Sequence, residues 1–318
     1  MKVPVSEVAK ILSARREAGQ EAQGVVRLSV MVDLAGPVEL GRCLRAALRP
    51  QRSGGRLHVE GFHAGGLPQV NALSDAAVVL CAGAGESPEA AAALWRAYAQ
   101  AGVPCVVCGL FDGPDEAAGC EARLTGDGVD EADLLLALDA DAAVQALGEW
   151  LVASLPEEAA AAAASNFAFC RRALALSLVG GASGSNALVG LVALIPGADL
   201  PVMTATQVSL ALRLAAIYGV PLTAERLREV AAIVASAFGM RGVARLLVRA
   251  LPLPAFLVRA GIGAGGTYAV GRALISYFER LTAVGPGVDA VSPTDSVPLV
   301  PAGAAGPSQP TSLEGSAR

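Results

Sequence analysis

The feature that most limits the fold of this chain is a change of apolar pattern near residue 165. Before it, five short apolar runs alternate with stretches of helical periodicity, the arrangement of an α/β domain with a mostly parallel sheet. The runs are VVRLSVMVD, RLHVEGF, DAAVVLCAG, VPCVVCGLF and ADLLLALDA. After it we find only apolar, alanine-rich helical stretches, which continue to about residue 283. The sequence therefore predicts an N-terminal α/β domain followed by an all-α, apolar helical domain.

The same patterns divide the chain into four parts. We expect a short N-terminal helix over residues 1–24, the α/β domain over 25–157, the helical domain over 158–283 and a tail over 284–318. The tail has six prolines among Gly, Ser and Ala and no periodic apolar face, so we expect it to be disordered. Breaks between helices are predicted at GGASG, IPGADLP, YGVPLT, LPLP and GIGAGG, and helix caps at Ser87 and Asp141.

Charge is distributed unevenly between the two domains. The net charge is -5, but residues 1–165 carry -10 and residues 166–283 carry +7. The acidic total argues against a nucleic-acid partner recognised through whole-molecule charge. A basic, apolar half instead indicates a membrane or an acidic protein partner.

Compartment is indicated by the N-terminus and by the cysteines. The first twenty residues carry several charges and no apolar stretch, so no secretory signal is predicted. The six cysteines are scattered through the chain, which is typical of reduced thiols rather than of a disulfide framework. We expect a protein of the cytoplasm or of the cytoplasmic face of a membrane.

One degenerate nucleotide motif follows the first strand. In DLAGPVELGRCLRAAL, Gly36 and Gly41 have the spacing of a P-loop, but Arg42 and Cys43 stand where the P-loop has Lys and Ser/Thr. The guanidinium of Arg42 can still meet a phosphate. The thiol of Cys43 is a poor ligand for Mg²⁺, which prefers oxygen.

Two later segments occupy the positions, in chain order, of further GTPase motifs but lack most of the residues that define those motifs. The fourth run ends at Asp112, where a guanine-reading Asn-Lys-x-Asp would lie, and only the aspartate is kept. Around His63 no magnesium-directing acid appears. We therefore expect a degenerate P-loop GTPase-like fold without catalytic residues and without a cofactor. GTP is the alternative, and its degenerate binding residues would be Gly36, Gly41, Arg42, Cys43 and Asp112.

No metal site is predicted. Cys105 and Cys108 lie within an apolar strand, where their side chains point to opposite faces, and we interpret them as buried structural thiols.

The helical half contains an uncharged run and an arginine stripe. Residues 173–198 carry no charge over 26 positions, which is long enough for a membrane span, although their glycines and polar residues fit an internal hairpin or a core helix nearly as well. Arg241, Arg245 and Arg249 recur every four residues. On a helix they form one stripe that suits lipid headgroups or an acidic protein face, and an ordinary solvated face is the alternative.

Polar residues on the apolar helices form a second candidate cluster. We expect Asn186, Asp199, Gln207 and Arg213 to form a buried polar network, which would be structural first and functional second. Asp199 is also a candidate N-cap, because Pro201 follows in the first turn.

The helical half resembles the YcjF-like domain of unknown function 697. The resemblance spans roughly residues 170–283 and is carried by IPGADLP, by T-x-x-Q before Arg213, by IYG and by GGTYAVGRALISYFE. In that family the domain often follows an Era-like GTPase domain or a degenerate relative, and members are commonly membrane-associated. The resemblance implies membrane association and an active GTPase as partner, and it supplies no catalytic residue.

Three functions remain open at this point. The first is a non-catalytic pseudo-GTPase adaptor bound to membrane lipid through its helical domain, with self-association through Gly-rich helices as a further option. The second is a nucleotide-binding switch with a variant P-loop. The third is a soluble helical scaffold in the cytoplasm.

Overall fold

A computed structural model describes most of the α/β domain and much of the helical domain. The described residues are 19, 23–36, 38–192, 200–221, 223, 225–235 and 255–284. The predicted N-terminal helix over 1–24 lies almost wholly outside them, and the predicted tail over 284–318 lies outside them beyond its first residue. By contacts the chain forms two units, Met1–Ala283 and Val284–Arg318.

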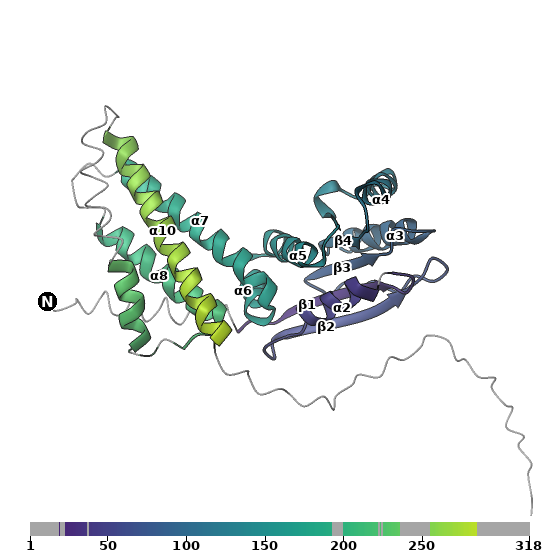
Figure 1. Ribbon diagram of the computed structural model, residues 1–318, viewed down its shortest axis with the longest axis horizontal. Coiled ribbons are helices and arrows are strands. Elements are labelled where there is room, and N and C mark those ends of the chain that lie inside the picture. The colour runs from purple at the N-terminus through teal and green to yellow at the C-terminus, as the bar shows by residue number, and fades with distance from the viewer. Residues whose placement is uncertain are drawn as a thin grey trace, which may run out of the picture. The chain divides into compact units, whose positions relative to one another are not determined.

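The five predicted runs form one parallel sheet (Figure 1). Its strands are β1 (Val26–Asp33), β2 (Gly55–Phe62), β3 (Ala76–Cys81), β4 (Cys105–Leu110) and β5 (Leu134–Ala137), in the order β2-β1-β3-β4-β5. All of β3 and nearly all of β4 is buried, because helices cover both faces of a parallel sheet. The predicted α/β fold is confirmed.

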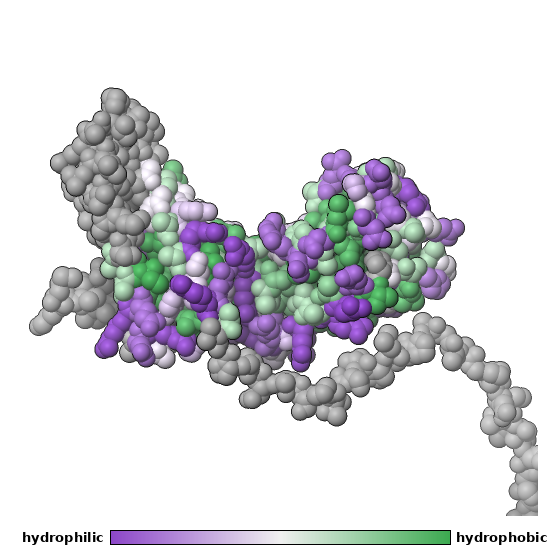
Figure 2. Space-filling model, in the orientation of Figure 1, coloured by the Kyte–Doolittle hydropathy of each residue, from purple (hydrophilic) through white to green (hydrophobic). Residues whose placement is uncertain are grey.

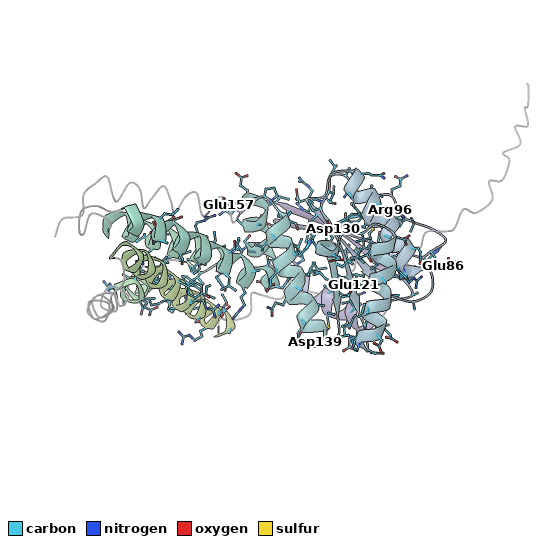
Figure 3. All side chains as sticks on the ribbon, turned by 90° about the horizontal axis from the view of Figure 1, so that it is seen from above. Glu86, Arg96, Glu121, Asp130, Asp139 and Glu157 are labelled. Atoms are coloured by element: carbon cyan, nitrogen blue, oxygen red, sulfur yellow. The ribbon has the colours of Figure 1, made fainter. Side chains whose placement is uncertain are left out.

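Helices cover the sheet on both faces. They are α2 (Val38–Ala47), α3 (Ser87–Gln100), α4 (Pro114–Gly126) and α5 (Ala140–Ser154), with the 3-10 turn η1 (Glu131–Asp133) before β5. The helix α4 was not predicted, because its sequence PDEAAGCEARLTG buries only Cys120 and Leu124. The predicted caps were wrong: the N-caps of α3 and α5 are Glu86 and Asp139, both labelled in Figure 3.

One carboxylate links η1, α3 and α5 through hydrogen bonds. Asp133 of η1 accepts a hydrogen bond from Trp95 Nε1 of α3 at 3.1 Å and another from Trp150 Nε1 of α5 at 2.9 Å. These are the only two tryptophans in the chain.

Helices are the only regular secondary structure among the described residues of the second half. It contains α6 (Glu157–Asn166), α7 (Ala168–Val192), α8 (Leu200–Tyr218), a helical stretch over 225–235 and α10 (Ala255–Val284). The predicted break after α8 is present, where Gly219 has φ of 70° and ends the helix in the left-handed region.

Two predicted breaks were wrong. GGASG lies inside α7 and GIGAGG inside α10. Each glycine costs about 1 kcal/mol relative to alanine in a helix interior. Neighbouring buried residues such as Val179, Asn186 and Thr267 hold both helices through these stretches. The predicted break at LPLP lies outside the described residues, and that at IPGADLP lies almost wholly outside them.

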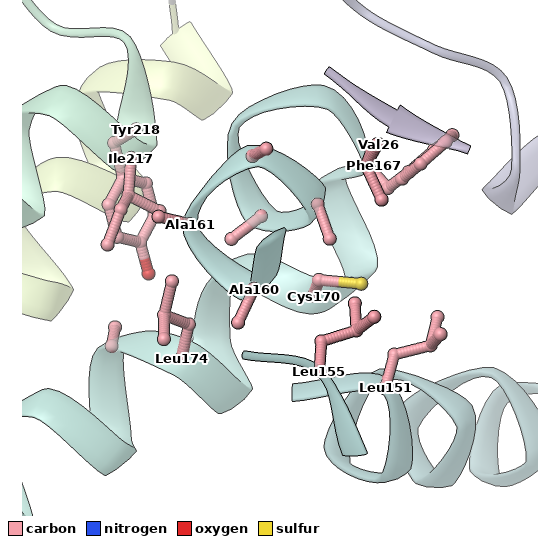
Figure 4. Close-up of a cluster of buried hydrophobic side chains, with 14 of the residues drawn as sticks. Val26, Leu151, Leu155, Ala160, Ala161, Phe167, Cys170, Leu174, Ile217 and Tyr218 are labelled. Carbon is pink, nitrogen blue, oxygen red and sulfur yellow. The ribbon is translucent and has the colours of Figure 1, made fainter. Parts of the chain in front are cut away.

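The helix α6 forms an interior layer between the sheet and the later helices. Its residues from Ala160 to Asn166 are all buried. Figure 4 shows Ala160 and Ala161 beside Leu155, which follows α5, Leu174 of α7 and Tyr218 of α8, within one continuous hydrophobic core. The two halves therefore share a core.

A close backbone approach and side-chain hydrogen bonds also join the α/β half to the helical half. A Cβ on Gly148 of α5 would lie 2.6 Å from the carbonyl oxygen of Phe169, so only glycine lets α5 pack this closely on α7. Arg52, after α2, donates to the carbonyl of Ala216 near the end of α8 at 3.4 Å. Arg171 donates to the carbonyl of Ala164 at 3.2 Å. Cations suit these carbonyls because helix C-termini are partly negative.

Within the described part of the chain, no helix combines the length and the apolarity that crossing a membrane requires. Residues 173–192 of the uncharged run belong to α7, and the remainder lies outside the described residues. On the face shown in Figure 2, hydrophilic and hydrophobic side chains are interspersed over the described residues.

Candidate functional site

A pocket opens at the carboxyl end of β1, beside the start of α2. Its volume is about 340 Å³. Asp33, Gly36 and Leu34 contribute from the end of β1 and its loop, Gly41, Arg42 and Arg45 from α2, and Leu80 and Cys81 from β3. The chain leaves β1 toward β2 on one side and returns to β3 on the other, so this edge is the topological switch point at which open α/β sheets bind ligands.

The carboxylate of Asp33 lies buried beneath this pocket. It accepts hydrogen bonds from the Ala35 amide at 2.9 Å, from the Ala82 amide at 3.2 Å and from the hydroxyl of Ser87. The hydroxyl of Ser87 in turn accepts from the Ala82 amide at 3.0 Å. The Gly36 amide donates to the Asp33 carbonyl at 3.0 Å. The amides of the first loop are therefore bonded to the chain's own oxygens.

The predicted nucleotide residues are only partly brought together. Gly36, Gly41 and Arg42 line the pocket, and the side chain of Arg42 is exposed. Cys43 and Asp112 are not among its lining residues. A P-loop holds phosphate with free backbone N–H groups, and here two of the nearby amides already hold the Asp33 carboxylate.

Cys81 is the unusual thiol of the site. Its Sγ lies 3.4 Å from Ser87 Oγ and accepts from the Gly83 amide at 3.4 Å. The hydrogen bond with Cys120 of α4 is the largest cause that lowers the pKa of Cys81 to about 7, with Ser87 and Gly83 adding to it and burial opposing it.

The other buried thiols behave in the opposite way. Burial raises the pKa of Cys108 to about 12, and it also raises the pKa values of Cys105 and Cys170. The pKa of Cys120 is also raised, mainly by its hydrogen bond to Cys81. Within the described residues, no group of His, Cys, Asp and Glu is placed to hold a metal ion.

A second buried polar cluster lies between α7, α8 and α10. Asn186 Nδ2 donates to Thr267 Oγ1 at 2.7 Å, and Gln207 Nε2 lies 3.5 Å from the same oxygen. All three side chains are fully buried. The oxygens Asn186 Oδ1 and Gln207 Oε1, together with the hydroxyl of Ser183, have no partner among the described residues.

Of the other two predicted network members, the structure describes only Arg213. Arg213 is half-buried and pairs with Glu157 at the start of α6, labelled in Figure 3. Six residues separate Gln207 from Arg213, which places them about 120° apart around the helix. Asp199 and the stripe of Arg241, Arg245 and Arg249 lie outside the described residues.

Sequence reasoning missed four site residues: Asp33, Cys81, Ser87 and Thr267. Asp33 had a signal, since a lone carboxylate ends an apolar strand at the switch edge. Ser87 looked like a helix cap, and nothing in the local sequence joined it to Asp33, 54 residues away.

Comparison of the sequence with models of protein families returned no match. Neither curated proteins nor solved structures match the chain.

Proposed function

We propose that this protein is a non-catalytic, pseudo-GTPase-like adaptor that attaches peripherally to the cytoplasmic face of a membrane through its helical domain. The observation that carries the first part is the Asp33 carboxylate, which accepts two backbone amides and the Ser87 hydroxyl at the switch edge. A nucleotide phosphate placed there would compete with a buried, like-charged group for the same donors. The site therefore suits a non-catalytic adaptor better than an enzyme that binds and hydrolyses a nucleotide.

The residues that GTP hydrolysis needs are also replaced. The ammonium on the β- and γ-phosphates and the hydroxyl on Mg²⁺ are absent from the loop sequence, where Arg42 and Cys43 stand. Retention of Gly36, Gly41 and Arg42 around one pocket is the specific observation that favours the alternative function, a nucleotide-binding switch with a variant loop.

Calorimetric titration of the full chain with GTP, GDP and ATP, each with Mg²⁺, tests this part. An adaptor gives no saturable heat at millimolar nucleotide. Saturable binding that is lost in Arg42→Ala and kept in the control Arg56→Ala, an exposed arginine on β2, would establish the switch instead.

The membrane part of the proposal is supported by sequence. The helical half carries a net charge of +7 and a stripe of three arginines, and its resemblance to YcjF-like domains points the same way. On this proposal the α/β domain remains free to bind a protein partner, for which an active GTPase is our first candidate.

Flotation of the full chain with vesicles tests attachment. We expect it to float with vesicles containing about one third anionic lipid and to stay behind with neutral vesicles or at high salt, because a surface charge contact is screened. Replacing Arg241, Arg245 and Arg249 by Ala should weaken flotation, whereas Arg42→Ala, on the α/β domain, should not. Failure to float with anionic vesicles would leave the soluble scaffold as the better function.

A further inference from the structure

The strand β2 is an exposed edge of the sheet. It pairs with β1 on one side, and among the described residues no strand pairs with its other side (Figure 1). The edge strand at the opposite end of the sheet, β5, has only four residues, whereas β2 has eight and contains neither proline nor lysine. Short strands, prolines and lysines are the usual means by which proteins protect a sheet edge from pairing. The edge at β2 is therefore open to a further strand.

The backbone hydrogen bonds to β1 show which groups of β2 are free. At the start of the strand, the Val26 amide donates to the Gly54 carbonyl at 3.0 Å. At its end, the Leu34 amide donates to the Phe62 carbonyl at 3.0 Å. Because backbone groups alternate between the two sides of a strand, the even-numbered residues of β2 face β1. The N–H and C=O groups that point away from β1 belong to the odd-numbered residues, which are Gly55, Leu57, Val59 and Gly61.

We propose that β2 pairs antiparallel with β2 of a second copy of this chain, across a two-fold axis at His58, so that one sheet continues through both copies. A two-fold axis brings the same edge of both copies together. This inference does not rest on the proposed adaptor function.

The backbone determines the register of this pair. With the axis at His58, Gly55 lies opposite Gly61 of the other copy and Leu57 lies opposite Val59, so each outward-pointing residue can exchange hydrogen bonds with another. Moving the axis by one residue, to Leu57 or Val59, leaves outward-pointing groups at one end of each strand without a partner in the other strand. The axis at His58 therefore pairs the whole strand.

The side chains are self-complementary in the same register. Arg56, which is exposed, lies opposite Glu60 of the other copy, and the symmetry repeats this pair of opposite charges. These are non-hydrogen-bonded positions, where facing side chains approach most closely. Glu60 lies on the same face of β2 as His58, which it contacts at 3.2 Å.

The other face of the strand is apolar at its centre. Val59 is 60% exposed, so no helix covers it, and the pairing would place Leu57 of the other copy beside it. Both faces of β2 thus fit a second β2. This match is the reason to infer a second copy of the chain rather than an unrelated strand as the partner.

Charge reversal tests the pairing in the full chain. Sedimentation over a dilution series should show a dimer, and Arg56→Glu or Glu60→Arg alone should raise its dissociation constant about tenfold or more, because each places two like-charged pairs across the axis. Combining the two substitutions in one chain, or mixing the two single variants, should restore dimers. Arg96→Glu, at an exposed arginine of α3, is the matched control and should not change the dissociation constant. A chain that stays monomeric at high micromolar concentration, or a dimer that neither reversal weakens, would overturn the proposal.

Cysteine substitution tests the register. Residue 58 faces itself across the axis, so mild oxidation of His58→Cys should link two chains through that position. Val59→Cys is the matched control, because residue 59 lies opposite residue 57 and should link poorly. Mass spectrometry assigns the linkage, since the chain has six cysteines of its own. Linkage in Val59→Cys that equals or exceeds that in His58→Cys would contradict the register, and linkage in neither variant would contradict the pairing.

Discussion

The two buried polar clusters of this molecule are built in different ways. At the switch edge, the Asp33 carboxylate has three donors, two of them backbone amides from different loops. Between α7, α8 and α10, Asn186 and Gln207 both point an amide nitrogen at Thr267, and their carbonyl oxygens have no partner among the described residues.

The two clusters differ because backbone N–H groups are available as donors in a loop but not in the interior of a helix. A strand that ends in a loop leaves amide groups unpaired, and a buried carboxylate can use them. In the interior of a helix every amide is already bonded to the carbonyl four residues earlier, so a side chain there can find only other side chains. Backbone amides thus stabilise the buried carboxylate of Asp33 at the carboxyl end of the strands. The cluster between α7, α8 and α10 consists of neutral side chains whose hydrogen-bonding groups are only partly paired among the described residues.

The largest expected effect is at the satisfied cluster. Asp33→Ala removes the acceptor of the Ala35 amide and of the Ser87 hydroxyl and one of the two acceptors of the Ala82 amide, and we expect the free energy of unfolding to fall by about 3 kcal/mol. Urea unfolding of the full chain measures this. The control is Asp112→Ala, an exposed aspartate just after β4, which should change stability by less than about 0.5 kcal/mol. Equal losses in the two variants would show that the Asp33 bonds contribute nothing special.

An intermediate effect is expected at the shared acceptor of the helical cluster. Thr267→Val keeps the shape of the side chain but removes the oxygen that faces two amide nitrogens, so the loss should be about 1–2 kcal/mol. Ser276→Ala, at an exposed position of the same helix, is the matched control. A neutral Thr267→Val would mean that the amide groups are satisfied elsewhere.

The smallest effect, and the one most specific to the comparison, is at Gln207. Its Oε1 has no partner among the described residues, and its one bond to Thr267 is long. Replacing an unsatisfied polar group by an apolar one of similar shape is nearly neutral or stabilising, so Gln207→Met should shift stability by less than about 0.5 kcal/mol or raise it. A loss of about 2 kcal/mol or more would place Gln207 in the same class as Asp33.

Much of the fold was predictable because it depends on local pattern. The five strands follow from apolar runs such as DAAVVL, and the helices that cover them from apolar spacing in stretches such as LWRAYAQ. The helix α4 was not predicted because Cys120 and Leu124 are its only buried residues, and two apolar positions do not make a helical periodicity. The glycines in GGASG and GIGAGG predicted helix breaks, because local sequence does not include the tertiary packing that keeps α7 and α10 continuous through these segments.

The site was less predictable because it depends on contacts between distant residues. Gly36, Gly41 and Arg42 line one pocket, and they could be expected to lie close together because they are near one another in the sequence. The bonds of Asp33 to Ala82 and Ser87 join segments about fifty residues apart, and only the strand order β1-β3 brings them together. Thr267 was missed for the same reason, since its partners lie on two other helices.

The two tryptophans that bond to Asp133 have an optical consequence. Both indoles belong to the α/β half, so tryptophan fluorescence, excited selectively over tyrosine, monitors that half. Far-ultraviolet circular dichroism, by contrast, is weighted toward the long helices of the other half. Since α6 belongs to the core of both, the two spectroscopic signals should disappear at the same denaturant concentration, as for a single cooperative unit.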